Sequence, residues 1–136
     1  MADAVTSQTI LDGDRLAILK FTNISDGTGE TAVNKVIVAN LAPNQFGLAC
    51  NGCIINRVWA STQGMAVNIL WDATADVLAY TIPTDTFYDM PFDSFGGIQN
   101  NSGAGKTGNI AFTTIGAGLN DSYSIILEVI KTYASA

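Results

Sequence analysis

The sequence contains no histidine and few charged residues. Histidine is the side chain that most readily transfers protons near neutral pH, and it is the commonest metal ligand in proteins. Its absence from all 136 residues excludes histidine-based catalytic triads and most zinc sites. Charged residues make up only 13% of the chain, against the roughly 25% that is usual for a globular domain. Because few charges would have to be desolvated at a contact, the composition favours packing into an assembly over catalysis.

The charge balance and the short apolar runs exclude two further classes of partner. Six basic residues stand against twelve acidic ones, for a net charge of −6, and no local cluster of Lys or Arg exists, so we expect no nucleic-acid binding. The longest apolar run, Ser124–Tyr133, is interrupted by Glu128 and Lys131. It is far shorter than the ~20 apolar residues of a membrane-spanning helix, so we expect no membrane partner. The segment Met1–Ala4 lacks the features of a secretion signal.

Hydrophobic residues alternate with polar ones along most of the chain, which is the period of a β-strand. Turn signals such as Asp12-Gly13-Asp14 separate the alternating runs at intervals of about ten residues. Strands are expected at Thr6–Leu11, Arg15–Asn23, Val33–Val38, Ile54–Ser61, Met65–Trp71, Val77–Ile82, Asn109–Ile115 and Tyr123–Val129, with a short irregular one at Phe87–Phe95. Eight or nine such strands predict an all-β fold: a two-sheet antiparallel β-sandwich, with a jelly roll as one arrangement, forming a single domain over residues 1–136.

Cys50-Asn51-Gly52-Cys53 has the spacing of a redox or metal-binding pair. A thioredoxin-like site needs this pair between a strand and a helix, whereas a strand is expected to follow here. A structural zinc would need two more Cys or His ligands. We therefore interpret the cysteines as small buried hydrophobes on either side of an Asn-Gly turn, and expect no metal and no cofactor.

The segment Asn100–Thr107 imitates a phosphate-binding loop. Asn100 replaces the first glycine of the pattern, and Ile110 and its neighbours look extended where a phosphate-binding loop requires a helix. The segment is interpreted as a loop between strands.

Several aspartates recur at short spacing, which raises the alternatives of an enzyme and a calcium site. A glycosidase would need two carboxylates roughly 5–9 Å apart in a cleft, but the prolines nearby favour turns, in which aspartates bond to the local backbone. The aspartates concerned are Asp72, Asp76, Asp85, Asp89 and Asp93. Asp26–Glu30 offers oxygen ligands without the ligand run of a known calcium loop. We expect no enzyme.

Two segments are candidate contacts between subunits. The Phe87–Phe95 segment is rich enough in aromatics to be partly exposed at such a contact. A polar N-terminal segment, residues 2–8, is expected to form a flexible arm. The candidate interface residues are Ala2, Val5, Phe87, Tyr88, Phe92 and Phe95.

The tryptophans leave an alternative function open. On a β-sandwich, aromatic residues belong to the core first, and serve as platforms for sugars second. An exposed Trp59 or Trp71 in a shallow groove would favour a carbohydrate-binding module that attaches to host glycans.

Four blocks of sequence stand out together: Ala2–Lys35, Ile55–Ala79, Phe95–Ile110 and Ser122–Tyr133. The second contains Trp-Asp-Ala-Thr at residues 71–74, and the third contains Phe-Gly-Gly-Ile-Gln-Asn-Asn at residues 95–101. In this combination the chain resembles, over nearly its whole length, a family of small virion structural proteins from tailed bacteriophages.

The resemblance implies a component of the virion, assembled in the bacterial cytoplasm. A capsid decoration or cement protein is the first expectation, and a neck, tail or fibre component is the alternative. Cement proteins of this kind are commonly β-sandwiches that sit as homotrimers on the outer shell and clamp the major capsid protein. The resemblance supplies no catalytic or ligand-binding residues.

Overall fold

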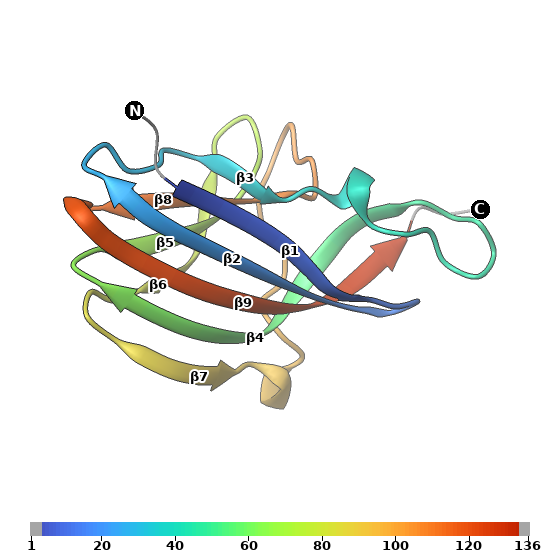
Figure 1. Cartoon of the computed structure of the whole chain (residues 1–136). Helices are drawn as coiled ribbons and strands as arrows, with labels where there is room; N and C mark the ends of the chain where they lie inside the picture. The colour runs from blue at the N-terminus through green and yellow to red at the C-terminus, as the bar shows by residue number, and fades with distance from the viewer. Residues whose placement is uncertain (1–3, 134–136) are drawn as a thin grey trace.

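The computed structural model describes residues 4–133, and almost all of its regular structure is β-strand (Figure 1). Two single-turn 3-10 helices, η1 (Val38–Asn40) and η2 (Asp93–Phe95), lie in the connections. No helix within this range is long and apolar enough to cross a membrane. The strands of the described range are β1 (Ala4–Asp12), β2 (Leu16–Asp26), β3 (Val33–Val36), β4 (Cys50–Gln63), β5 (Ala66–Trp71), β6 (Val77–Ile82), β7 (Phe87–Pro91), β8 (Ile110–Ile115) and β9 (Leu119–Tyr133).

Two antiparallel sheets face each other in the strand order of a jelly roll. One sheet has the order β1-β2-β9-β4-β7, and the other has the order β3-β8-β5-β6. From β2 onward the chain changes sheet at every connection except the β5–β6 hairpin, which is the path of two Greek keys folded together. The remaining strand, β1, is added to the edge of the five-stranded sheet by the hairpin at Gly13. The predicted β-sandwich is confirmed, and its arrangement is the jelly roll.

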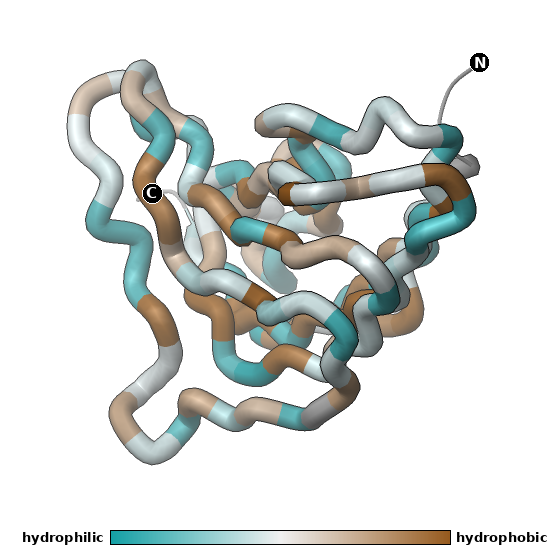
Figure 2. Tube along the Cα trace, turned by 90° about the vertical axis from the view of Figure 1, so that its left-hand side faces the viewer, coloured by the Kyte–Doolittle hydropathy of each residue, from teal (hydrophilic) through white to brown (hydrophobic). Residues whose placement is uncertain are grey.

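The core lies between the sheets and is filled mainly by alternate residues of β2, β4, β5, β8 and β9, whereas no described side chain of the edge strands β1 and β7 is among its buried residues. Figure 2 shows apolar and polar residues mixed along the chain. Phe112 of β8 joins the two layers, because its ring lies 5.4 Å from that of Phe21 and 5.8 Å from that of Tyr123. Each such fully buried side chain contributes about 1.5–3 kcal/mol to folding. The largest fully buried side chains are Trp71, Tyr123, Phe21, Phe112, Ile55, Met65, Ile69, Ile82, Ile110, Ile125, Leu127 and Val36.

Strand β4 is longer than the sequence predicts and absorbs the expected Asn51-Gly52 turn. The two residues lie within the strand at a β-bulge, where Gly52 pairs with Thr132 of the long strand β9. Gly108 packs against them, since a Cβ at that position would lie 2.3 Å from the carbonyl oxygen of Asn51. The prediction of a turn is wrong, because continuous pairing with β9 outweighs the local turn preference of Asn-Gly.

The prediction of a flexible N-terminal arm is also wrong for residues 4–8. These residues belong to β1, which pairs with β2 from Ala4 opposite Ile24 onward. The sequence predicts this strand only from Thr6, whereas backbone pairing with β2 extends it to Ala4. Ala2 lies outside the described residues.

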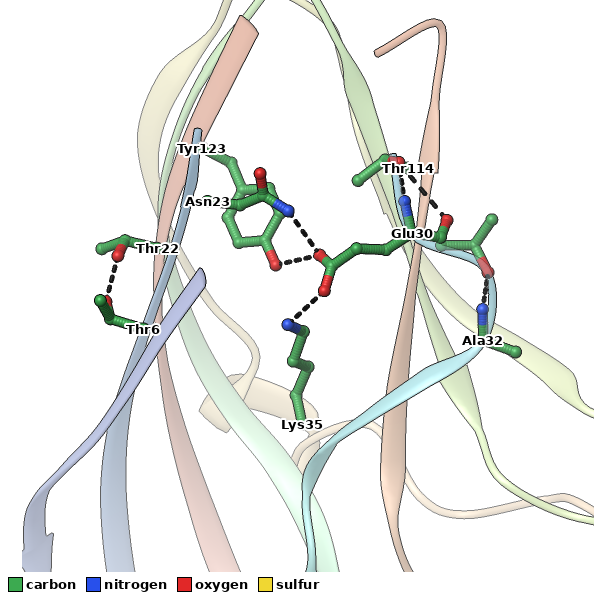
Figure 3. A network of polar contacts seen from close by, with 9 residues as sticks. Thr6, Thr22, Asn23, Glu30, Ala32, Lys35, Thr114 and Tyr123 are labelled. Carbon is green, nitrogen blue, oxygen red and sulfur yellow. Dashed lines mark hydrogen bonds and ion pairs between the residues drawn. The ribbon is translucent and has the colours of Figure 1, made fainter. Parts of the chain in front are cut away.

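A buried polar network ties the five-stranded sheet to the loop before β3 (Figure 3). Glu30 is 8% exposed, and its carboxylate accepts hydrogen bonds from Asn23 Nδ2 at 2.9 Å and Tyr123 Oη at 2.6 Å. Its other oxygen pairs with the ammonium of Lys35, whose side chain is 3% exposed. The backbone of Glu30 is held by Thr114 of β8. The residue considered as a calcium ligand is therefore a structural ion-pair partner.

Candidate binding surface

The outer face of the five-stranded sheet carries a row of side chains that crosses all five strands. In β4, the residues Arg57, Trp59 and Ser61 lie on this face, because Val58 and Ala60 between them are buried in the core. The strand register sets the row that passes through Trp59: Gln8, Lys20, Ile126, Trp59 and Asp89. The neighbouring row toward one end is Thr6, Thr22, Ser124, Ser61 and Phe87.

A shallow hollow of about 530 Å³ opens between these two rows. Trp59, which is half-buried, and Phe87, which is 85% exposed, supply its aromatic surface. The other residues that line it are Lys20, Ala60, Ser61, Asp89, Ser124 and Ile126. We call this feature the Trp59 hollow.

An ion pair holds one side of the Trp59 hollow. Arg57 Nε donates to Asp89 Oδ1 at 2.6 Å and Nη2 donates to Oδ2, and the guanidinium carbon lies 4.8 Å from the centroid of the Trp59 ring. The hydrogen bonds from Arg57 lower the pKa of Asp89, and the same bonds raise the pKa of Arg57. Asp89 is therefore an ionised acceptor at neutral pH, and Arg57 fixes both the carboxylate and one face of the indole.

Three polar groups in the hollow are not engaged. The side chains of Lys20, Ser61 and Ser124 make no hydrogen bond or ion pair with any residue in the part of the chain that the structure describes. By contrast, the other half-buried or buried cations Lys35, Arg57 and Lys131 each pair with a carboxylate. The hollow thus combines two aromatic rings with donors and acceptors that are free to bind a ligand.

The predicted interface residues are dispersed over the structure. Val5 is 41% exposed on β1, at the opposite edge of the sheet from β7, so it does not meet Phe87 (Figure 1). Phe87 lines the Trp59 hollow, and Tyr88 follows it in β7 opposite Ala60. Phe95 is 66% exposed in η2.

Phe92 is buried, which corrects its prediction as a surface residue. It is 6% exposed, and its ring lies 5.3 Å from that of Tyr80 and 6.0 Å from that of Phe95. The two sheets meet at this edge, so β6 covers a side chain that the sequence alone places in an exposed aromatic segment.

The two tryptophans have different environments. Trp71 is fully buried in the core, which excludes it from any sugar platform. Trp59 lies in the shallow hollow. Its neighbours Lys20, Ser124 and Ile126 were not predicted from the sequence. The outward alternation Arg57-x-Trp59-x-Ser61 is nevertheless a signal that this face carries both polar and aromatic side chains.

The cysteine pair lies in a second cleft of about 790 Å³, between η1, the start of β4 and the loop before β8. Both thiols are buried, as predicted, and Cys53 Sγ lies 3.8 Å from the carbonyl oxygen of Gly108. Burial, together with the neighbouring Cys50, raises the pKa of Cys53 to about 12. A thiol of this kind stays protonated and unreactive at neutral pH.

The remaining motifs have structural roles. Residues 100–107 form the predicted loop before β8. Asp76 accepts a hydrogen bond from the nearby backbone amide of Ala73, as expected of a turn residue. Asp85 instead accepts from the amide of Gly64, which is 21 residues away in the sequence. Within residues 4–133, no three His, Cys, Asp or Glu residues come together as metal ligands.

Comparison with known proteins yields little similarity. No family model and no curated protein matches the chain. Among solved structures, the chain is similar to a mutant of CBM29-2, a family 29 carbohydrate-binding module. The two share 13% identity over 95% of this chain and 92% of that one, with a TM-score of 0.36. A likeness at that level has no bearing on function.

Proposed function

We propose that this protein is a structural component of a bacteriophage particle, and that it decorates the outer capsid shell as a cement protein. Three observations support the proposal, and the first two concern the sequence and the fold. Four blocks of the sequence resemble small virion structural proteins, and the jelly roll is a fold that capsid domains use, as lectins also do.

The observation that carries the proposal is a stack of aromatic rings at the β6–β7 edge of the sandwich. Tyr80 packs on Phe92, and Phe92 packs on Phe95, so the stack runs outward from the core. It ends in Phe95, which is 66% exposed, and Met90 of β7 is 37% exposed. We call these four residues the apolar edge.

An anchor of this kind suits a protein partner. The buried ring of Phe92 holds Phe95 in place, so docking costs little side-chain entropy, and rigid aromatic anchors dominate the energy of many interfaces. Symmetry on a shell repeats each contact many times, so that weak individual contacts give firm attachment through avidity. The proposed partners are the major capsid protein and, in a homotrimer, other copies of this chain.

The test uses phage particles that carry the protein. Particle reconstruction locates the chain, and thereby separates a position on the head from one on the neck, tail or fibre. Re-addition of purified protein to particles that lack it then measures occupancy. Phe95→Ser is expected to reduce occupancy at least tenfold. Phe46→Ser is the matched control, because Phe46 is 78% exposed and stacks on no other described ring.

Three results would contradict the proposal. They are absence of the chain from purified particles, equal occupancy for the two variants, and a location away from the shell. A light-scattering mass of the free protein tests the trimer separately.

A further inference from the structure

The Trp59 hollow lies apart from the apolar edge, on the outward face of the five-stranded sheet. Its aromatic rings come from β4 and β7, whereas its polar groups come from four strands: Lys20, Ser61, Asp89 and Ser124. Such a mixture of a mainly apolar surface and a few converging polar groups is typical of small-molecule sites.

The free polar groups decide which class of ligand fits. An apolar side chain of a protein partner would cover Lys20, Ser61 and Ser124 without satisfying them. A buried donor left without a partner costs about 1–3 kcal/mol, so three such groups would oppose that contact. The occupant must therefore bring hydroxyl or carboxylate groups together with an apolar surface.

A pyranose ring has both properties, since its C–H groups form an apolar face and its hydroxyls form a polar rim. The C–H face matches the electron-rich faces of Trp59 and Phe87. The rim hydroxyls match the hydroxyls of Ser61 and Ser124, which both donate and accept, and the carboxylate of Asp89, which accepts. From this complementarity we infer that the Trp59 hollow is a saccharide-binding site.

The charge of Lys20 indicates which class of saccharide the site prefers. It is the cation at the hollow with no carboxylate partner among the described residues, whereas Arg57 is already paired with Asp89. A sugar that carries a carboxylate would supply the missing partner. The site therefore prefers a uronic-acid type of saccharide to a neutral one.

The experiment follows tryptophan fluorescence of the whole chain during titration with galacturonic acid oligomers and, in parallel, with neutral galactose oligomers. Trp71 is fully buried, so a change in emission reports on Trp59. We expect saturable binding of both probes, tighter for the acidic one. Calorimetry with Trp59→Ala should show affinity for both probes at least tenfold weaker, which corresponds to about 1.4 kcal/mol.

Two further variants sharpen the test. Lys20→Ala should weaken binding of the acidic oligomer about three- to fivefold and leave the neutral one unchanged, and added salt should have the same effect. Ile24→Ser is the matched control on the same sheet, because Ile24 is 55% exposed and does not line the hollow. It should bind both probes like the unchanged protein.

Absence of binding by both probes, or equal binding by Trp59→Ala and Ile24→Ser, would overturn the inference. So would emission of Trp59 that responds to phage particles and to no saccharide, since a protein would then fill the hollow. These outcomes are independent of the cement function, which is tested through Phe95.

Discussion

Replacing Glu30 by alanine is expected to lower the free energy of unfolding by about 3–5 kcal/mol, the usual cost of removing one partner of a buried ion pair. The side chains of Glu30 and Lys35 are 6% and 3% exposed, so neither charge is compensated by water. The same substitution removes the acceptor of the hydrogen bonds from Asn23 and Tyr123. For a domain whose stability is about 5–15 kcal/mol, this loss is about a fifth of the total or more.

Urea unfolding measures the effect, and a set of variants separates charge from hydrogen bonding. Glu30→Gln keeps an acceptor for the two neutral donors but leaves Lys35 as an uncompensated charge, so it should remain strongly destabilising. Combining it with Lys35→Met removes both charges and should recover most of the lost stability. The unfolding midpoint should change while the slope with urea stays the same, because the fold itself is retained.

Two results would refute this reasoning. If Glu30→Ala lowered the free energy of unfolding by less than about 1 kcal/mol, the Glu30–Lys35 ion pair would stabilise the fold no more than an exposed ion pair does. A double variant less stable than Glu30→Gln would mean that the charges are not coupled.

Three further predictions rest on other parts of the structure. Gly108→Ala should lower the free energy of unfolding by about 1–3 kcal/mol, because φ at Gly108 is 85° and a Cβ there would clash with a carbonyl oxygen. Thermal unfolding should show a smaller loss of stability for Gly47→Ala, where φ is 81° but no atom lies within reach of a Cβ. Burial alone would lower the pKa of Lys131, but its hydrogen bond to Asp12 and its interaction with Tyr133 raise the pKa overall. The stability that these interactions contribute is therefore fully present below the ordinary lysine pKa and is lost as pH rises through the higher folded pKa; alkaline urea unfolding should show this loss, and Lys131→Met should lack it. Cys53, with a pKa of about 12, should resist alkylation at pH ~8 until the protein unfolds, and mass mapping of the alkylated peptide would detect earlier reaction.

The alternation of apolar and polar residues predicts the sandwich because, in strands such as β2 and β5, the apolar positions themselves mark the face that is buried. Phe21 and Ile69, for example, are placed in the core by their own neighbours in sequence. The lengths of the strands are harder to predict from the sequence, because the start of β4 depends on its pairing with β9, about 80 residues away. The burial of Phe92 likewise depends on Tyr80, which belongs to the other sheet.

The Trp59 hollow could not be predicted for a related reason. Its residues come from β2, β4, β7 and β9, and only the register between these strands brings Lys20, Trp59 and Phe87 together. A shift of one residue in any of the strands would turn that strand's contribution to the opposite face. The sequence shows which residue types are present, but only the register of the folded sheet brings them together.

The two proposed sites share β7 but use opposite faces of it, and this makes their functions separable. Asp89 points to the outer face, opposite Trp59, while Met90 lies on the side of the buried residue Val58. A subunit held through Met90 and Phe95 would contact the shell with one edge of the sandwich and leave the adjoining sheet face in solvent. Phe95→Ser should therefore lose particle binding and keep saccharide binding, whereas Trp59→Ala should do the reverse. Loss of both activities in either variant would show that the two surfaces act as a single interface.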